Sequence, residues 1–293
     1  MKKNLLLSIC ALLCASSAFA DDTTTPLTVS SGFNIDAIAA STTDVPSAVG
    51  PIDGHGSQFV AESYDGVTAG NNEGIPVNGK LTTAGGHVYQ LGNFFVSNCF
   101  YIGITAKDSH TLGTATSGTV TFSNPTAGSK LGILMAGTNR TNENLQFNLK
   151  VTHQNGTTED LGSFKVSDWG QNDKSDAVFT FTKRFRFDAG SNPENGSFRL
   201  SEVIATIGDD NVASPITSVT ITTECQDDNW GYGSLAFYAF SAISTTTGIE
   251  NATVQNAKVQ GIYTVDGKQV AEPTKGVNVV KYTDGTARKV VVK

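Results

Sequence analysis

Hydrophobic and polar residues alternate strictly along residues 147–152, where Phe147, Leu149 and Val151 are the hydrophobic members. A period of two is typical of a β-strand with one buried face, and it does not fit a helix. Asn155-Gly156 follows at once, and both residues tolerate the positive φ of a tight hairpin turn. Residues 131–136 carry no polar face, which predicts a central strand covered on both sides.

The rest of the chain extends this pattern to an all-β fold. Glycine and threonine are abundant and no long amphipathic helical pattern occurs. We expect a flexible leader at 21–31 and a jelly-roll-type antiparallel β-sandwich at 32–246, whose first strand covers 32–39. A small C-terminal β-module is expected at 247–293.

Two long stretches lack hydrophobic periodicity, residues 41–58 and 65–86. Loops of this length are usually either functional or disordered. Strands are expected to resume after them at 88–91, 94–96 and 100–104.

Residues 1–20 have the pattern of a secretion signal, with Lys2 and Lys3 before a hydrophobic run and a small-residue cleavage site. Cys10 and Cys14 offer a lipoprotein alternative, although no small residue precedes either of them. We therefore expect a secreted or cell-surface protein. No later stretch reaches the roughly 18 hydrophobic residues of a membrane helix, so no transmembrane segment is expected.

Charge argues against nucleic acid as a partner. The formal net charge is −7, and loss of Lys2 and Lys3 with the signal makes it −9. Nucleic acids and anionic membrane surfaces require a concentrated basic face.

Only Cys99 and Cys225 lie beyond the signal. In an oxidising compartment they could form a disulfide, and two buried free thiols are the alternative. Two cysteines without neighbouring histidines do not make a zinc site.

The two tryptophans of the chain lie beside acidic or amide residues. Sugar sites commonly combine a flat aromatic face with planar carboxylates or amides that orient hydroxyl groups. The alternative for Trp169 is that it ends a strand and caps the core. The candidate carbohydrate-binding residues are Trp169, Asp168, Trp230, Asp228, Asn229 and Tyr232.

Oxygen-rich loops offer a structural Ca²⁺ site, for which Asp227 and Asp228 are the candidate ligands. Ordinary turn chemistry of Asp and Asn is the alternative explanation. Catalysis is not expected, because the carboxylates show no spacing that pairs them for glycoside hydrolysis and no Gly-x-Ser-x-Gly elbow occurs.

Several short motifs carry a resemblance to known families. The body resembles secreted β-sandwich domains of bacterial surface and exported proteins, and its architecture is similar to the galactose-binding-like jelly rolls that include many carbohydrate-binding modules. That resemblance implies sugar binding. The motifs lie at 32–39, 118–122, 155–157, 166–169, 216–221 and 237–241.

The C-terminal part resembles the sorting tails that address exported Bacteroidetes proteins to the type IX secretion system. The resemblance implies the secretion machinery as a partner. Asp266-Gly267 and Asp284-Gly285 are expected to turn one strand of this module onto the next. The resembling segments are 247–250, 259–270, 273–276 and 290–293.

The sequence as a whole favours an exported, non-catalytic protein that binds extracellular glycans. A structural or adhesive surface protein that binds other proteins is the first alternative. A glycoside hydrolase with an unrecognised cleft is the second.

Overall fold

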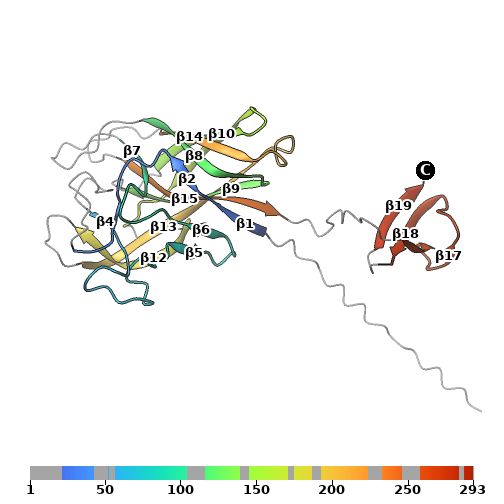
Figure 1. Cartoon of the computed structure of the whole chain (residues 1–293), viewed down its shortest axis with the longest axis horizontal. Coiled ribbons are helices and arrows are strands. Elements are labelled where there is room, and N and C mark those ends of the chain that lie inside the picture. The colour runs from blue at the N-terminus through green and yellow to red at the C-terminus, as the bar shows by residue number, and fades with distance from the viewer. Residues whose placement is uncertain are drawn as a thin grey trace, which may run out of the picture. The chain divides into compact units, whose positions relative to one another are not determined.

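The chain is all-β. The computed structural model describes residues 22–42, 52, 57–103, 116–138, 145–170, 175–186, 193–223, 233–245, 258–283 and 287–292. It divides into two compact units, Met1–Thr246 and Thr247–Lys293. Every regular element in the described ranges is a β-strand, so the all-β prediction is confirmed (Figure 1). The same ranges contain no helix long and hydrophobic enough to cross a membrane.

Two large sheets form the body of the first unit. The larger one has the order β1-β15-β9-β13-β12-β4-β3, with β7 also paired to β15, and the smaller one has the order β11-β10-β14-β8-β2. The larger sheet comprises β1 (Asp22–Leu27), β3 (Ile38–Ala39), β4 (Ser57–Val60), β7 (Phe100–Gly103), β9 (Lys130–Thr138), β12 (Ala177–Arg186), β13 (Glu194–Thr206) and β15 (Ser234–Thr245). The smaller sheet comprises β2 (Val29–Ser31), β8 (Ser117–Thr126), β10 (Leu145–His153), β11 (Thr158–Val166) and β14 (Ile216–Thr223).

The hairpin predicted from the alternating pattern is confirmed. β10 and β11 pair antiparallel on either side of Asn155-Gly156, and Gly156 has a φ of 85°. Phe147, Leu149 and Val151 are fully buried, whereas the residues between them are not.

The sandwich core lies between the two sheets. Leu131, Ile133 and Met135 of β9 pack there with residues of β10 and β14. Phe237 of β15 contacts Phe147 of the opposite sheet edge to face, with ring centroids 5.2 Å apart. Contacts of this kind join the two sheets.

A second core covers the opposite face of the larger sheet. Leu134 and Ala136, the alternate residues of β9, belong to it together with Tyr238 of β15. Much of its other side comes from the described residues of the segment 35–101 that lie outside β3, β4 and β7, including the irregular stretch that follows β4. We call this segment the covering layer. The prediction that β9 is covered on both sides is confirmed.

Three local expectations were wrong. Residues 22–27 and 29–31 are not a flexible leader, because they form β1 and β2 and pair with β15 and β8. Threonine is β-branched and favours strands, and Leu27 anchors β1 in the core at 2% exposure. Within 32–39 only β3 is a strand, and Phe94–Phe95 lie in a turn.

The remaining strands form two small sheets. β5 (Lys80–Thr82) and β6 (Val88–Gln90) make a hairpin in the covering layer. The second unit holds one four-stranded sheet in the order β17-β16-β18-β19. Gly267 takes a φ of 82° in the turn before β17, as the sequence predicts, and Asp284-Gly285 lie outside the described residues. The strands of the second unit are β16 (Val259–Thr264), β17 (Gln269–Val270), β18 (Gly276–Tyr282) and β19 (Ala287–Val292).

We expect Phe237→Ala to destabilise the first unit by about 3–5 kcal/mol, because it leaves a cavity in the sandwich core beside Phe147. Denaturant unfolding followed by tryptophan fluorescence measures the change. Val265→Ala is the control, since Val265 is 76% exposed in the second unit. A loss below about 1 kcal/mol for Phe237→Ala would contradict this account of the core.

Candidate functional site

Two turns of the covering layer line a small open pocket of about 220 Å³, which we call the Phe95 pocket. One turn precedes β5 and the other follows β6, so the β5–β6 hairpin brings them together. The lining residues are Val77, Asn78, Gly79, Gln90, Leu91, Gly92, Asn93, Phe94 and Phe95.

The Phe94–Phe95 turn separates two neighbouring aromatic rings. Phe94 is 6% exposed and belongs to the second core, whereas Phe95 is 63% exposed. The Phe95 amide donates a hydrogen bond of 2.9 Å to Asn93 Oδ1, which holds the turn. The inward ring thus anchors the turn and the outward ring stands in solvent.

Three side-chain amides lie in the same pocket. Asn78 Oδ1 accepts from the Lys80 amide at 2.9 Å, just as Asn93 Oδ1 accepts from Phe95. Gln90 Nε2 donates to the Asn78 carbonyl at 2.8 Å. No other described residue bonds the Nδ2 groups of Asn78 and Asn93 or Oε1 of Gln90. The three side chains are therefore held in fixed orientations, while the two Nδ2 donors and the Oε1 acceptor remain open to a ligand.

Gly79 allows Gln90 to lie close to the backbone of the pocket. It closes a turn in which its amide donates to the Pro76 carbonyl at 2.8 Å, and its φ is 63°. A Cβ at this position would lie 3.0 Å from Gln90 Nε2. The Gly79 carbonyl in turn accepts from the Leu91 amide at 2.9 Å.

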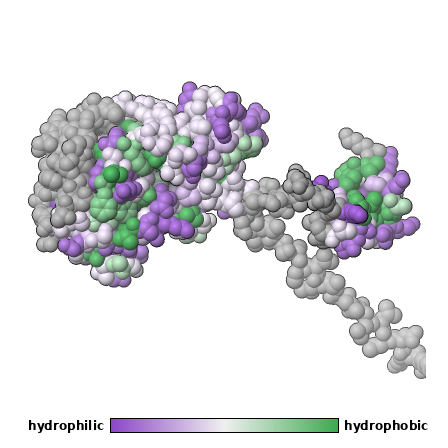
Figure 2. All heavy atoms as spheres, viewed as in Figure 1, coloured by the Kyte–Doolittle hydropathy of each residue, from purple (hydrophilic) through white to green (hydrophobic). Residues whose placement is uncertain are grey.

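Exposed hydrophobic residues frame the pocket. Val77 is 62% exposed and Val96, next to Phe95, is 55% exposed. Figure 2 shows hydrophobic residues gathered among hydrophilic ones on the visible face of the first unit, toward the side where Figure 1 labels β4 and β12. An exposed aromatic ring beside open amides is suited to a ligand with both C–H faces and hydroxyl groups.

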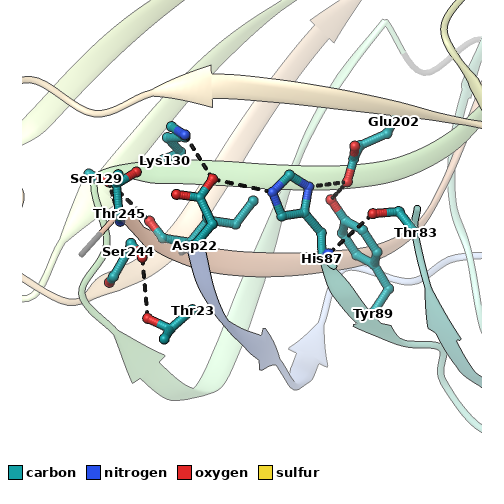
Figure 3. Close-up of polar contacts among 11 residues, drawn as sticks. Asp22, Thr23, Thr83, His87, Tyr89, Ser129, Lys130, Glu202, Ser244 and Thr245 are labelled. Atoms are coloured by element: carbon teal, nitrogen blue, oxygen red, sulfur yellow. Dashed lines mark hydrogen bonds and ion pairs between the residues drawn. The ribbon is translucent and has the colours of Figure 1, made fainter. Parts of the chain in front are cut away.

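A polar cluster fastens the β5–β6 hairpin to the larger sheet (Figure 3). The His87 ring lies between two carboxylates, with Nδ1 2.9 Å from Glu202 Oε1 of β13 and Nε2 3.4 Å from Asp22 Oδ2 of β1. Tyr89 donates a hydrogen bond of 2.7 Å to the same Glu202 oxygen. Lys130 of β9 lies 2.9 Å from Asp22 Oδ2.

The contacts of this cluster fix the position of the β5–β6 hairpin. A carboxylate only accepts hydrogen bonds, so both His87 contacts are hydrogen bonds only when both ring nitrogens donate. Ser241 of β15 also donates to the Val88 carbonyl at 2.7 Å. Because Gln90 ends the same strand, these contacts set the position of the Phe95 pocket.

Two pKa values in the cluster are shifted. The hydrogen bond from Lys130 lowers the pKa of the Asp22 carboxyl from 3.8 to about 2, and hydrogen bonds from Thr245 and His87 act in the same direction. Burial raises the pKa of the Tyr89 hydroxyl, and the Glu202 carboxylate raises it further. Tyr89 therefore remains a donor to Glu202.

Trp169 lies in the second core instead of on the surface. It is 4% exposed, and its ring contacts Phe59 at 4.9 Å and Phe198 at 5.0 Å between centroids. No ring face is open to stack on a sugar, which corrects its assignment as a stacking residue. Asp168, beside it, accepts a hydrogen bond of 2.8 Å from the Gly170 amide.

The other predicted binding residues lie outside the described residues. They are Asp227, Asp228, Asn229, Trp230 and Tyr232. The calcium ligands expected among them therefore stay a prediction. Within the described ranges, no group of three or more His, Cys, Asp or Glu side chains could hold a metal ion.

Cys99 is a fully buried free cysteine, and burial raises the pKa of its thiol. Its expected disulfide partner, Cys225, lies outside the described residues. In the structure Cys99 is therefore one of the buried free thiols that the sequence offered as the alternative, and the predicted disulfide is not formed at Cys99.

Sequence reasoning missed Phe95 and the three amides of its pocket. The Phe94–Val96 segment resembles a short strand because three hydrophobic residues follow one another. Asn93 before this run was the available signal, since Asn favours turns by bonding the amide two residues on. No protein-family model matches the chain, and no curated protein matches it.

We expect Asp22→Asn to destabilise the protein at neutral pH and to flatten its acid unfolding. Because the folded pKa lies below the unfolded value of 3.8, the stabilisation is complete above about pH 4 and is lost as pH falls through about 2. Lys130 is 32% exposed, so solvent screening limits the effect to about 1–2 kcal/mol.

Denaturant unfolding at several pH values measures this difference. Asp210→Asn is the matched control, because Asp210 is exposed and lies in a turn. A difference between the wild type and Asp22→Asn that stays constant from neutral pH to pH 2 would refute the role of the ion pair.

Proposed function

We propose that this protein is an exported or cell-surface, non-catalytic protein that binds extracellular glycans in the Phe95 pocket. The observation that supports this proposal is the 63% exposed ring of Phe95 beside amides with open hydrogen-bonding groups. Burying the exposed ring against the C–H face of a sugar removes apolar surface from water. The amides supply the directional contacts that distinguish hydroxyl groups.

The preorganisation of the pocket favours specific binding. Asn78 and Asn93 are each held by the turn that they stabilise, so little side-chain entropy is lost when their Nδ2 groups bind a ligand. The volume of about 220 Å³ is below that of a drug-sized site, which suits one sugar ring.

A second candidate function is adhesion to another protein. Val77, Phe95 and Val96 are all more than half exposed, and exposed hydrophobic side chains often mark protein interfaces. This alternative depends on the hydrophobic side chains and not on the open amide donors. The two candidates therefore respond differently to substitution of the amides.

We also propose that the second unit directs export, in line with the resemblance of its sequence to sorting tails. Its own four-stranded sheet supports a separate role for it. In the native host, a chain ending at Thr246 should leave the cytoplasm but fail to reach the cell surface. Protease accessibility on whole cells measures this, and surface exposure of the shortened chain would refute the proposal.

We expect Asn93→Asp and Phe95→Ala each to weaken glycan binding by about tenfold or more. Asn93→Asp keeps the Oδ1 acceptor that holds the turn and replaces the open donor with an oxygen. Binding of the full mature chain on a glycan array, with calcium and with chelator, measures the effect. Val265→Ala is the control for loss of an exposed hydrophobic side chain.

The outcomes separate the two candidates. Weaker glycan binding by both variants supports the glycan-binding proposal. A requirement of this binding for calcium would add support for the predicted metal. A folded wild type that binds no glycan on the array would overturn the proposal. Unchanged glycan binding by both variants would show that the glycan does not bind in the Phe95 pocket.

A further inference from the structure

A second pocket of about 420 Å³ lies against the strand β12. The loop after β4, the strand β5 and the strand β12 contribute its walls. We call it the Phe179 pocket. The side chains that matter for its chemistry are Glu62, Lys80, Thr82, Phe179 and Thr180.

The two pockets share one wall. Pro76 lines the Phe179 pocket, residues 77–79 line the Phe95 pocket, and residues 80–82 line the Phe179 pocket again. Gly79 and Lys80 are consecutive, so one chain segment lines both pockets, and we call residues 76–80 of this segment the ridge.

The Phe179 pocket also places an aromatic ring beside polar side chains, which here are charged groups and hydroxyls. Phe179 is half-buried against the second core and presents the rest of its ring. The side chains of Lys80, Thr82 and Thr180 are exposed and bond no other described residue. Glu62 Oε1 accepts from the Gly70 amide at 2.7 Å. One cation and one anion face the pocket, which suits a neutral ligand rich in hydroxyl groups.

The outer wall of this pocket is held in place by backbone contacts. The Asn72 carbonyl accepts from the Thr182 amide of β12 at 2.8 Å, and the φ of Asn72 is 55°. Lys183 forms an ion pair of 2.7 Å with Glu73. The Ile75 amide donates to the Val60 carbonyl at 2.8 Å. Such a wall needs little ordering when a ligand binds.

We infer that the Phe179 pocket is a second sugar subsite, so that the ligand is a neutral oligosaccharide chain crossing the ridge at residues 76–80. This inference rests on the proposed glycan binding of the Phe95 pocket. One sugar unit lies against Phe95 and a following unit lies against Phe179. The charged and hydroxyl groups of the second pocket bind the hydroxyls of the following unit.

Titration calorimetry on the full mature chain tests the inference. The probes are glucose, xylose, mannose, galactose and N-acetylglucosamine, each compared with its β-linked disaccharide and tetrasaccharide. For the series that binds, the tetrasaccharide should bind at least about tenfold more tightly than the monosaccharide. The double variant Lys80→Ala/Thr82→Ala should remove most of this gain and leave monosaccharide affinity unchanged.

Controls make each outcome decisive. Both substituted side chains are exposed, and Lys165→Ala on β11 is the matched loss of an exposed lysine. Equal affinity for monosaccharide and tetrasaccharide, or an unaffected double variant, would overturn the second subsite and leave the Phe95 pocket standing. Absence of binding to every probe by folded protein would overturn both. Phe95→Ala should weaken binding at every ligand length.

Discussion

The larger sheet has to be covered on both faces, and the rest of the first unit is arranged to meet that requirement. All residues from Leu131 to Thr138 of β9 are buried, as are the first ten residues of β15. Leaving either face in water would cost a free energy of about 25 cal/mol for each Å² of exposed apolar surface. The smaller sheet covers one face. Much of the cover on the other face is the layer that contains the β5–β6 hairpin.

A covering layer with little regular structure needs specific polar contacts to hold it. His87 and Tyr89 reach Glu202, and Asn98 Oδ1 accepts from the buried Ala37 amide at 2.9 Å. Asn34 bonds both the amide and the carbonyl of Tyr101. At Ala37 and Tyr101 a side chain thus satisfies buried backbone groups that a sheet ladder would otherwise satisfy. These bonds specify one arrangement of the layer.

The candidate site follows from this arrangement. The turn buries Phe94 in the second core and leaves its neighbour Phe95 exposed, and the same layer contributes the amides and walls of the second pocket. Binding residues on loops that a rigid scaffold positions are common in proteins. Glycan binding, the role proposed for this surface, uses such a layer without requiring movement of the sheets.

The sequence by itself determined what depends on local periodicity. The alternation ending at Val151, the turn at Asn155-Gly156 and the apolar run at 131–136 predicted a hairpin and a doubly covered strand, and the structure has both. Only the tertiary structure decided that Trp169 is enclosed by Phe59 and Phe198 and that Phe95 is exposed. Exposure of an aromatic ring depends on which distant segments pack against it, and no local pattern encodes those contacts.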